Sequence, residues 1–190
     1  MLRIGIDFDN TLVDYRPVLA SAAHELSLLE RHAAAHKSDA PFTKEEIREL
    51  LRSRPGGEAD WQRLQAHVYG IAIARAPAFE GLDRFVREAR RRGCALYVVS
   101  HKSRFAAAAP DGPDLREAAH AWLQTSGLAF DAVYFEPTRE AKFERLASLQ
   151  LTHFIDDLEE VLRDPAFPPA IRGIHFRDSW DAVFTDVFAG

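Results

Sequence analysis

The sequence contains only one cysteine, Cys94, among its 190 residues. A single cysteine can form neither an internal disulfide nor a cysteine-rich metal site, and this usage is typical of a reducing cytoplasm. No stretch approaches the roughly 18 consecutive apolar residues of a membrane helix. Asp7 interrupts the apolar run at the N-terminus, so no secretory signal is expected. We therefore expect a cytoplasmic protein without membrane contact.

The chain also lacks an excess of positive charge, internal repeats and low-complexity linkers. Its formal net charge is −5, which gives no electrostatic basis for binding nucleic acid. Hydrophobic residues make up 47% of the sequence, enough to exclude a disordered chain. The length allows one substantial core, with or without a small accessory domain.

Short apolar runs alternate with amphipathic patterns over most of the chain. The runs at 2–8, 94–99, 131–135, 152–155 and 172–176 predict buried strands, and the segments at 81–92, 113–126 and 139–149 predict helices. Strands that alternate with helices in this way favour a parallel sheet with helices on both faces. The sequence predicts an α/β fold with a three-layer, Rossmann-like core.

Residues 15–80 interrupt this alternation, because they show helical patterns and no strand. One helix is predicted from Pro17 to about residue 35, and a second begins at the capping box of Thr43 and Glu46. A third is predicted from about residue 60 to 74. We interpret the stretch as a small all-helical insertion after the first strand. The predicted domains are a core of residues 1–14 and 81–190 and a helical domain of residues 15–80.

Polar residues gather where the predicted strands end. They are Asp7, Asp9 and Thr11 after the first strand, Ser100 after the second, Asp156 and Asp157 after the fourth, and Lys142 near the start of a helix. In open α/β sheets, ligands bind beyond the carboxyl ends of the strands. Clustered carboxylates repel one another unless a cation compensates, and oxygen ligands favour Mg²⁺. The sequence therefore predicts a magnesium site at this edge.

Such a site suits phosphoryl transfer, because a metal ion and a lysine can neutralise the charge on the transferring group. Asp7 and Asp9 are two residues apart, so on a regular strand they would share a face. One carboxyl group could then attack while the other handles protons.

Four segments resemble, in order and spacing, the signatures of the haloacid dehalogenase-like superfamily. They are 7–12 (DFDNTL), 98–100 (VVS), Lys142 fourteen residues before Asp156, and 154–157 (FIDD). The likeness covers residues 1–14 and 81–176. Four ordered signatures are far more specific than any one of them.

The resemblance implies a role for each matching residue. Asp7 would be the nucleophile that forms an aspartyl-phosphate, and Asp9 the general acid and base. Mg²⁺ would be held by Asp7, the backbone carbonyl of Asp9 and Asp156. Asp157 would belong to the metal site by acting through water or by supporting these ligands. Thr11, Ser100 and Lys142 would bind the phosphoryl group, with Lys102 as an alternative to Lys142. The helical insertion resembles the small cap of many members.

Asp9 also separates the reactions of this superfamily. The resemblance implies that carbon–halogen cleavage needs no acid two residues after the nucleophile, whereas phosphate ester cleavage does. The expected activity is therefore phosphatase, on a small phosphorylated metabolite. A phosphomutase with the same core and a non-catalytic protein that binds phosphorylated ligands are the alternatives. The sequence specifies neither the substrate nor the oligomeric state.

Overall fold

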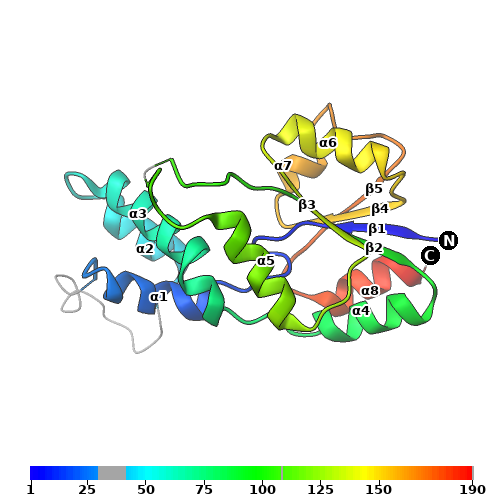
Figure 1. Ribbon diagram of the computed structural model, residues 1–190, viewed down its shortest axis with the longest axis horizontal. Coiled ribbons are helices and arrows are strands. Elements are labelled where there is room, and N and C mark those ends of the chain that lie inside the picture. Colours follow the sequence, from blue (N-terminus) through cyan, green and yellow to red (C-terminus); the bar gives the residue numbers. More distant parts are fainter. Residues whose placement is uncertain (30–41, 108, 190) are drawn as a thin grey trace. The chain divides into compact units, whose positions relative to one another are not determined.

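The computed structural model describes residues 1–29, 42–107 and 109–189, which form two compact units (Figure 1). The first unit comprises residues 1–14, 78–103 and 123–190, and the second comprises residues 15–77 and 104–122. The sequence predicted that only residues 15–80 lie outside the sheet domain. In the structure, residues 104–122 also belong to the second unit. No helix in the described part of the chain combines the length and apolar character needed to cross a membrane.

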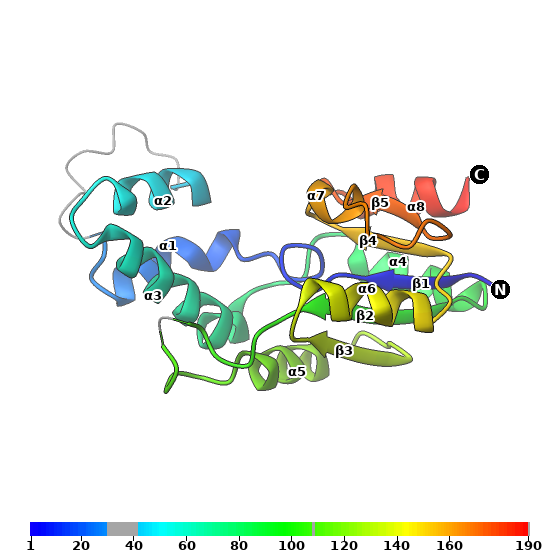
Figure 2. The same cartoon turned by 90° about the horizontal axis from the view of Figure 1, so that it is seen from above.

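The first unit is built on a five-stranded parallel sheet (Figure 2). Its strands are β1 (Arg3–Ile6), β2 (Ala95–His101), β3 (Ala132–Glu136), β4 (His153–Asp156) and β5 (Arg172–His175). Their order across the sheet is β3-β2-β1-β4-β5. The chain thus leaves β1 toward β2 on one side and returns to β4 on the other, which makes the β1–β4 boundary the topological switch point. The predicted α/β fold is confirmed.

The helices of this unit cover both faces of the sheet, as Figure 1 shows. One face carries α4 (Leu82–Arg91) and α8 (Trp180–Phe188), and the other carries α6 (Arg139–Ser148) and α7 (Glu159–Leu162). Aromatic rings fill the α4 and α8 side, where Trp180 packs on Phe85 and Phe176. Burial of these side chains supplies the main stabilisation of the layers.

Strand β1 lies so close to its neighbours that one position admits no side chain. A Cβ atom at Gly5 would come within 2.4 Å of Leu151 Cδ1 and 2.9 Å of Phe154 Cδ2. The glycine therefore allows Leu151 and Phe154, both buried, to pack directly against the backbone of the central strand. Phe154 belongs to β4, so this contact helps to set the geometry of the switch point.

The second unit is helical over the described part of residues 15–77. It contains α1 (Arg16–Glu25), α2 (Lys44–Arg52), α3 (Gly57–Gly70) and the 3₁₀ helix η2 (Ala72–Arg75), and it also holds the start of α5 (Leu115–Ser126). The predicted capping box is confirmed, because the Thr43 hydroxyl accepts from the Glu46 amide and Glu46 accepts from the Thr43 amide. It fixes the start of α2.

One predicted helix boundary in this unit is wrong. Helix α1 was expected to continue to residue 35, but it ends at Glu25 because Ser27 adopts a left-handed φ of 55° and its amide donates to the His24 carbonyl. Residues 30–41, where the rest of that helix was predicted, lie outside the described residues. Residues 104–122 join this unit through α5, where the buried Trp122 indole donates to the Ala76 carbonyl at 2.8 Å.

Candidate active site

Strand register brings two acids together at the switch point. Ile6 of β1 pairs with Ile155 of β4, so Asp7 and Asp156, one residue farther along each strand, stand side by side. The Asp7 amide donates to the Ile155 carbonyl at 2.8 Å, which continues the ladder by one hydrogen bond. Both side chains are buried, with exposed fractions of 8% for Asp7 and 1% for Asp156.

Lys142 joins these two acids. Its Nζ atom lies 2.6 Å from Asp7 Oδ1 and 2.7 Å from Asp156 Oδ2, and it sits over the Phe154 ring at 5.0 Å from the centroid. The lysine is in the first turn of α6, where Thr138 caps the helix by accepting from the Ala141 amide at 3.1 Å. A buried ammonium is tolerated only with such partners. The pairing explains why a lysine occupies this helix terminus.

Burial dominates the proton affinity of this cluster. It raises the pKa of Asp7 to about 6, with a further upward contribution from Asp156, although the Lys142 ammonium acts in the opposite direction. For Lys142, burial alone would lower the pKa, but the attraction of Asp7 and Asp156 raises it above its usual value. Asp7 is therefore held in a site that disfavours its charged form.

Asp7, Asp156 and Asp157 offer oxygen atoms that all lie within 4.8 Å of one another. The first two contact Lys142, and Asp156 Oδ1 also accepts from the Leu158 amide at 2.8 Å. Thr11 Oγ1, fully buried, lies 3.5 Å from Asp157 Oδ1. Three converging carboxylates are a donor set that fits a hard divalent cation such as Mg²⁺.

Asp9 lies in a different part of the site. Strand β1 ends at Ile6, and Asn10 takes a left-handed φ of 56°, so Asp9 belongs to the turn and the regular-strand geometry assumed from the sequence does not apply. Both oxygens of its carboxylate accept from Lys102 Nζ, at 2.9 and 2.8 Å. The metal ligand expected from the sequence at this position is the backbone carbonyl of Asp9, and not this carboxylate.

Ser100 and Lys102 lie at the end of β2, and Lys102 contacts Asp9. Both are buried, with exposed fractions of 2% and 4%, whereas the intervening His101 is exposed. This alternation follows the two-residue period of a strand. The structure thus brings together both lysines considered from the sequence, Lys142 beside Asp7 and Lys102 beside Asp9.

Comparison with known protein families agrees with this geometry. Residues 3–162 match the family model described as haloacid dehalogenase-like hydrolase. The chain belongs to the haloacid dehalogenase-like hydrolases. No curated protein sequence matches it.

Solved structures share the fold of this hydrolase at low sequence identity. One described as a predicted phosphatase from Clostridium acetobutylicum has a TM-score of 0.61 and 14% identity, and covers 100% of this chain and 99% of its own. A hydrolase from Streptococcus pneumoniae TIGR4 has a TM-score of 0.57 and 14% identity, covering 99% and 98%. A putative β-phosphoglucomutase from Thermotoga maritima has a TM-score of 0.53 and 15% identity, covering 96% and 90%. These likenesses show the fold.

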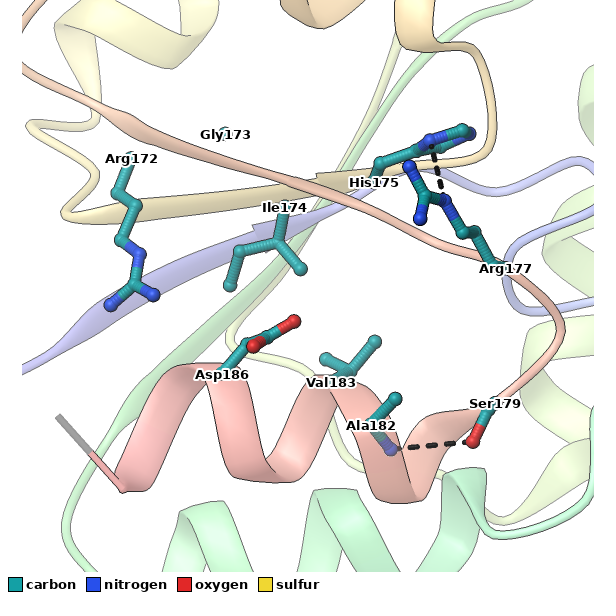
Figure 3. A pocket seen from close by; sticks show the side chains of 9 residues that line it. All are labelled: Arg172, Gly173, Ile174, His175, Arg177, Ser179, Ala182, Val183 and Asp186. Carbon is teal, nitrogen blue, oxygen red and sulfur yellow. Dashed lines mark hydrogen bonds between the residues drawn. The ribbon is translucent and has the colours of Figure 1, made fainter.

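One residue that supports the acidic cluster of this hydrolase was not predicted from the sequence. His175, at the end of β5, pairs in register with Asp156, and its Nε2 atom lies 3.0 Å from the Asp157 carbonyl oxygen. Its Nδ1 atom accepts from Arg177 Nε at 3.1 Å (Figure 3), so Nε2 carries the proton and donates to Asp157. In the sequence, only the position of His175 at the end of a predicted strand could have indicated this role.

His175 and Arg177 also line a cavity of about 320 Å³ between β5 and α8, shown in Figure 3. Ile174 and Val183 contribute its apolar part, and Arg172 and Asp186 its polar rim. The cavity is lined by none of the acids or lysines of the candidate active site, so it is a separate feature of the same unit.

Proposed function

We propose that this hydrolase is a Mg²⁺-dependent phosphatase that cleaves a small phosphorylated metabolite through an aspartyl-phosphate on Asp7. The observation that carries the proposal is the convergence of Asp7, Asp156 and Asp157 within 4.8 Å, with Lys142 Nζ in contact with the first two. In such an arrangement, the Lys142 ammonium stands beside the nucleophile and can neutralise negative charge on a transferring phosphoryl group.

In the first step, an oxygen of Asp7 attacks phosphorus and the bond from phosphorus to the leaving oxygen breaks. Asp9 donates a proton to that oxygen, which departs as an alcohol. In the second step, Asp9 takes a proton from water, the water oxygen attacks phosphorus, and inorganic phosphate leaves Asp7. Lys142 holds Asp7 through Oδ1 during attack, and Thr11, Ser100 and Lys142 bind the phosphoryl oxygens.

The side chains of Asp7, Asp156 and Asp157, with the Asp9 backbone carbonyl, are the proposed Mg²⁺ ligands. A bound ion would neutralise phosphoryl charge and would lower the pKa of Asp7 from its raised value. Burial and two hydrogen bonds hold these ligands in place. The Leu158 amide donates to Asp156, and His175 donates to the Asp157 carbonyl. We assign the helical unit of residues 15–77 the role of a cap that sets specificity.

A phosphomutase is the second candidate, because the same residues serve both reactions and a structure described as a putative β-phosphoglucomutase shares the fold. A mutase would return the phosphoryl group from Asp7 to a substrate and not to water. A non-catalytic binding protein is the less favoured alternative, since all the carboxylates that catalysis needs are present.

Phosphate release from p-nitrophenyl phosphate and from a panel of sugar, nucleoside and carboxylic acid phosphates tests the proposal. We expect release with Mg²⁺, none with EDTA, and restoration when Mg²⁺ is returned. Asp7→Asn should lower turnover by at least about 10³-fold. Asp181→Asn, which changes an exposed acid on α8, is the matched control and should leave turnover unchanged. Equal turnover in Asp7→Asn would reject the nucleophile, and product formation only in the presence of a second sugar phosphate would identify a mutase.

A further inference from the structure

Lys102 is a buried ammonium that the proposed reaction leaves without a role. It follows β2, where its amide donates to the Glu136 carbonyl of β3 at 2.9 Å, so the backbone at this point is fixed to the sheet. Its side chain is 3% exposed and lies over the Phe8 ring, with Nζ 5.2 Å from the centroid. Placing a lysine here is unfavourable unless its charge is compensated.

The compensating group is Asp9. Lys102 Nζ lies 2.9 Å from Oδ1 and 2.8 Å from Oδ2, so the ammonium is shared between the two carboxylate oxygens. Lys142, in contrast, contacts Asp7 and Asp156. The two lysines therefore contact different acids. The sequence offered Lys102 and Lys142 as alternatives for binding one phosphoryl group, but their positions differ.

The proposed role of Asp9 in proton transfer requires its carboxyl group to be held in one orientation. It stands in the turn after β1, beside Asn10 in the left-handed region, and its side chain is 23% exposed. Proton transfer requires a fixed distance and direction between this carboxyl group and the oxygen with which it exchanges the proton. Since each carboxylate oxygen has two lone pairs, the contact with Lys102 leaves acceptor capacity for the transferred proton.

We propose that Lys102 is a positioning residue that orients the Asp9 carboxyl group for proton transfer to the leaving oxygen and from the attacking water. The inference rests on the proposed phosphatase function and assigns Lys102 no contact with the transferring phosphoryl group. The alternative roles are phosphate binding, as considered from the sequence, and support of the fold alone. The three roles differ in how a variant responds to the leaving group.

The test measures kcat/KM for aryl and alkyl phosphates of increasing leaving-group pKa, with wild type, Lys102→Ala and Lys102→Arg. The parameter kcat/KM reports the step in which the leaving group departs, and only a basic leaving oxygen needs a proton from Asp9. We expect Lys102→Ala to lose about 100-fold or more with an alkyl phosphate but less than about 10-fold with 2,4-dinitrophenyl phosphate. Lys102→Arg should recover part of the alkyl activity, because a guanidinium can pair with both oxygens.

Inhibition by inorganic phosphate supplies the second readout. If Lys102 only positions Asp9, the inhibition constant of phosphate for Lys102→Ala should stay within about threefold of the wild-type value, because the groups that bind phosphate are unchanged. A phosphate ligand predicts a marked rise in that constant and an equal loss of kcat/KM for every leaving group, and this result would overturn the proposal. Arg91→Ala, which removes an exposed cation of α4, is the control and should match wild type throughout.

Thermal unfolding of each variant separates a structural role from a positioning role. A loss of kcat/KM that is uniform across the series and follows a fall in Tm would also overturn the proposal. If Lys102→Ala does not fold, Lys102→Arg carries the test, because displacement of the cation should still increase the dependence on the leaving group. An inactive wild-type protein would refute the phosphatase function itself, whereas an active one with a flat response in the variants would refute only the role of Lys102.

Discussion

At the scale of single residues, the site is a balance between buried acids and two lysines. Asp7 and Asp156 share Lys142, and Asp9 pairs with Lys102. These side chains are largely removed from water. The paired charges do not compensate fully, because burial still raises the pKa of Asp7 to about 6. The charged form of Asp7 is therefore unfavourable in this site, and a divalent cation bound beside it would stabilise that form.

This imbalance predicts how stability changes with pH in the absence of metal. The pKa of Asp7 rises from its ordinary value of 3.8 to about 6 in the folded protein, so the folded state binds the proton more tightly. Its contribution to the free energy of unfolding is present below about pH 4 and is lost as the pH rises through 6. Asp7→Asn removes this pH-dependent loss of stability, and the amide oxygen still accepts a hydrogen bond from Lys142. We expect the variant to gain about 1–3 kcal/mol relative to wild type between pH 4 and pH 7.

Urea unfolding in EDTA across this pH range measures the difference. Asp83→Asn is the control: Asp83 is exposed, and its pKa is lowered by a hydrogen bond from the Arg84 amide and by Arg87, so its replacement should give no such gain with rising pH. A constant difference between Asp7→Asn and wild type from pH 4 to pH 7 would contradict the raised pKa of Asp7.

At the scale of elements, the residues of the candidate site lie at the ends of strands and in the first turn of a helix. Strands β1 and β4 deliver Asp7 and Asp156, and α6 delivers Lys142 from its first turn. The turn is set by Thr138, whose hydroxyl accepts from the Ala141 amide at 3.1 Å and whose carbonyl accepts from the Lys142 amide at 3.1 Å. Loss of the cap would therefore act on both stability and the position of Lys142.

We expect Thr138→Ala to lower the free energy of unfolding by about 1 kcal/mol, because the first turn of α6 loses a hydrogen-bond acceptor. Lys142 should then be held less firmly, and turnover should fall about 2- to 10-fold. Chemical denaturation and phosphate release measure the two effects. Thr138→Ser retains the hydroxyl and should recover most of both losses, whereas equal losses in the two variants would show that the hydroxyl is not the cause.

Many of the helices and strands could be predicted from the sequence, because they depend on local residue patterns. The strands before Asp7 and Asp156 were recognisable as apolar runs, and the Thr43 capping box as a spacing. The end of α1 was not predictable in this way, since Ser27 adopts a left-handed conformation that its residue type does not announce. The pairing of Lys102 with Asp9 depends on side-chain directions from two elements 93 positions apart.

At the scale of the whole molecule, the chain combines a parallel sheet unit with a helical unit. Both were predicted from the sequence, but residues 104–122 were placed with the sheet because a helix between two strands ordinarily covers that sheet. In the structure, Trp122 instead donates to Ala76, and Pro113 lies where a side chain at Gly70 would be, so the segment packs with the helical unit. Such long-range contacts leave no periodic signal in the sequence.

Intact-protein mass spectrometry can detect a phosphoryl group on Asp7. Asp9→Asn should still be phosphorylated by 2,4-dinitrophenyl phosphate with Mg²⁺, because this leaving group needs no acid, but it should hydrolyse the intermediate slowly without a base. We predict an acid-quenched chain heavier by one phosphoryl group, located in the peptide that contains Asp7, and no such species in Asp7→Asn. Two results would contradict Asp7 as the nucleophile. The wild-type protein could release phosphate while Asp9→Asn shows no modified Asp7, or the phosphoryl group could be found on another residue.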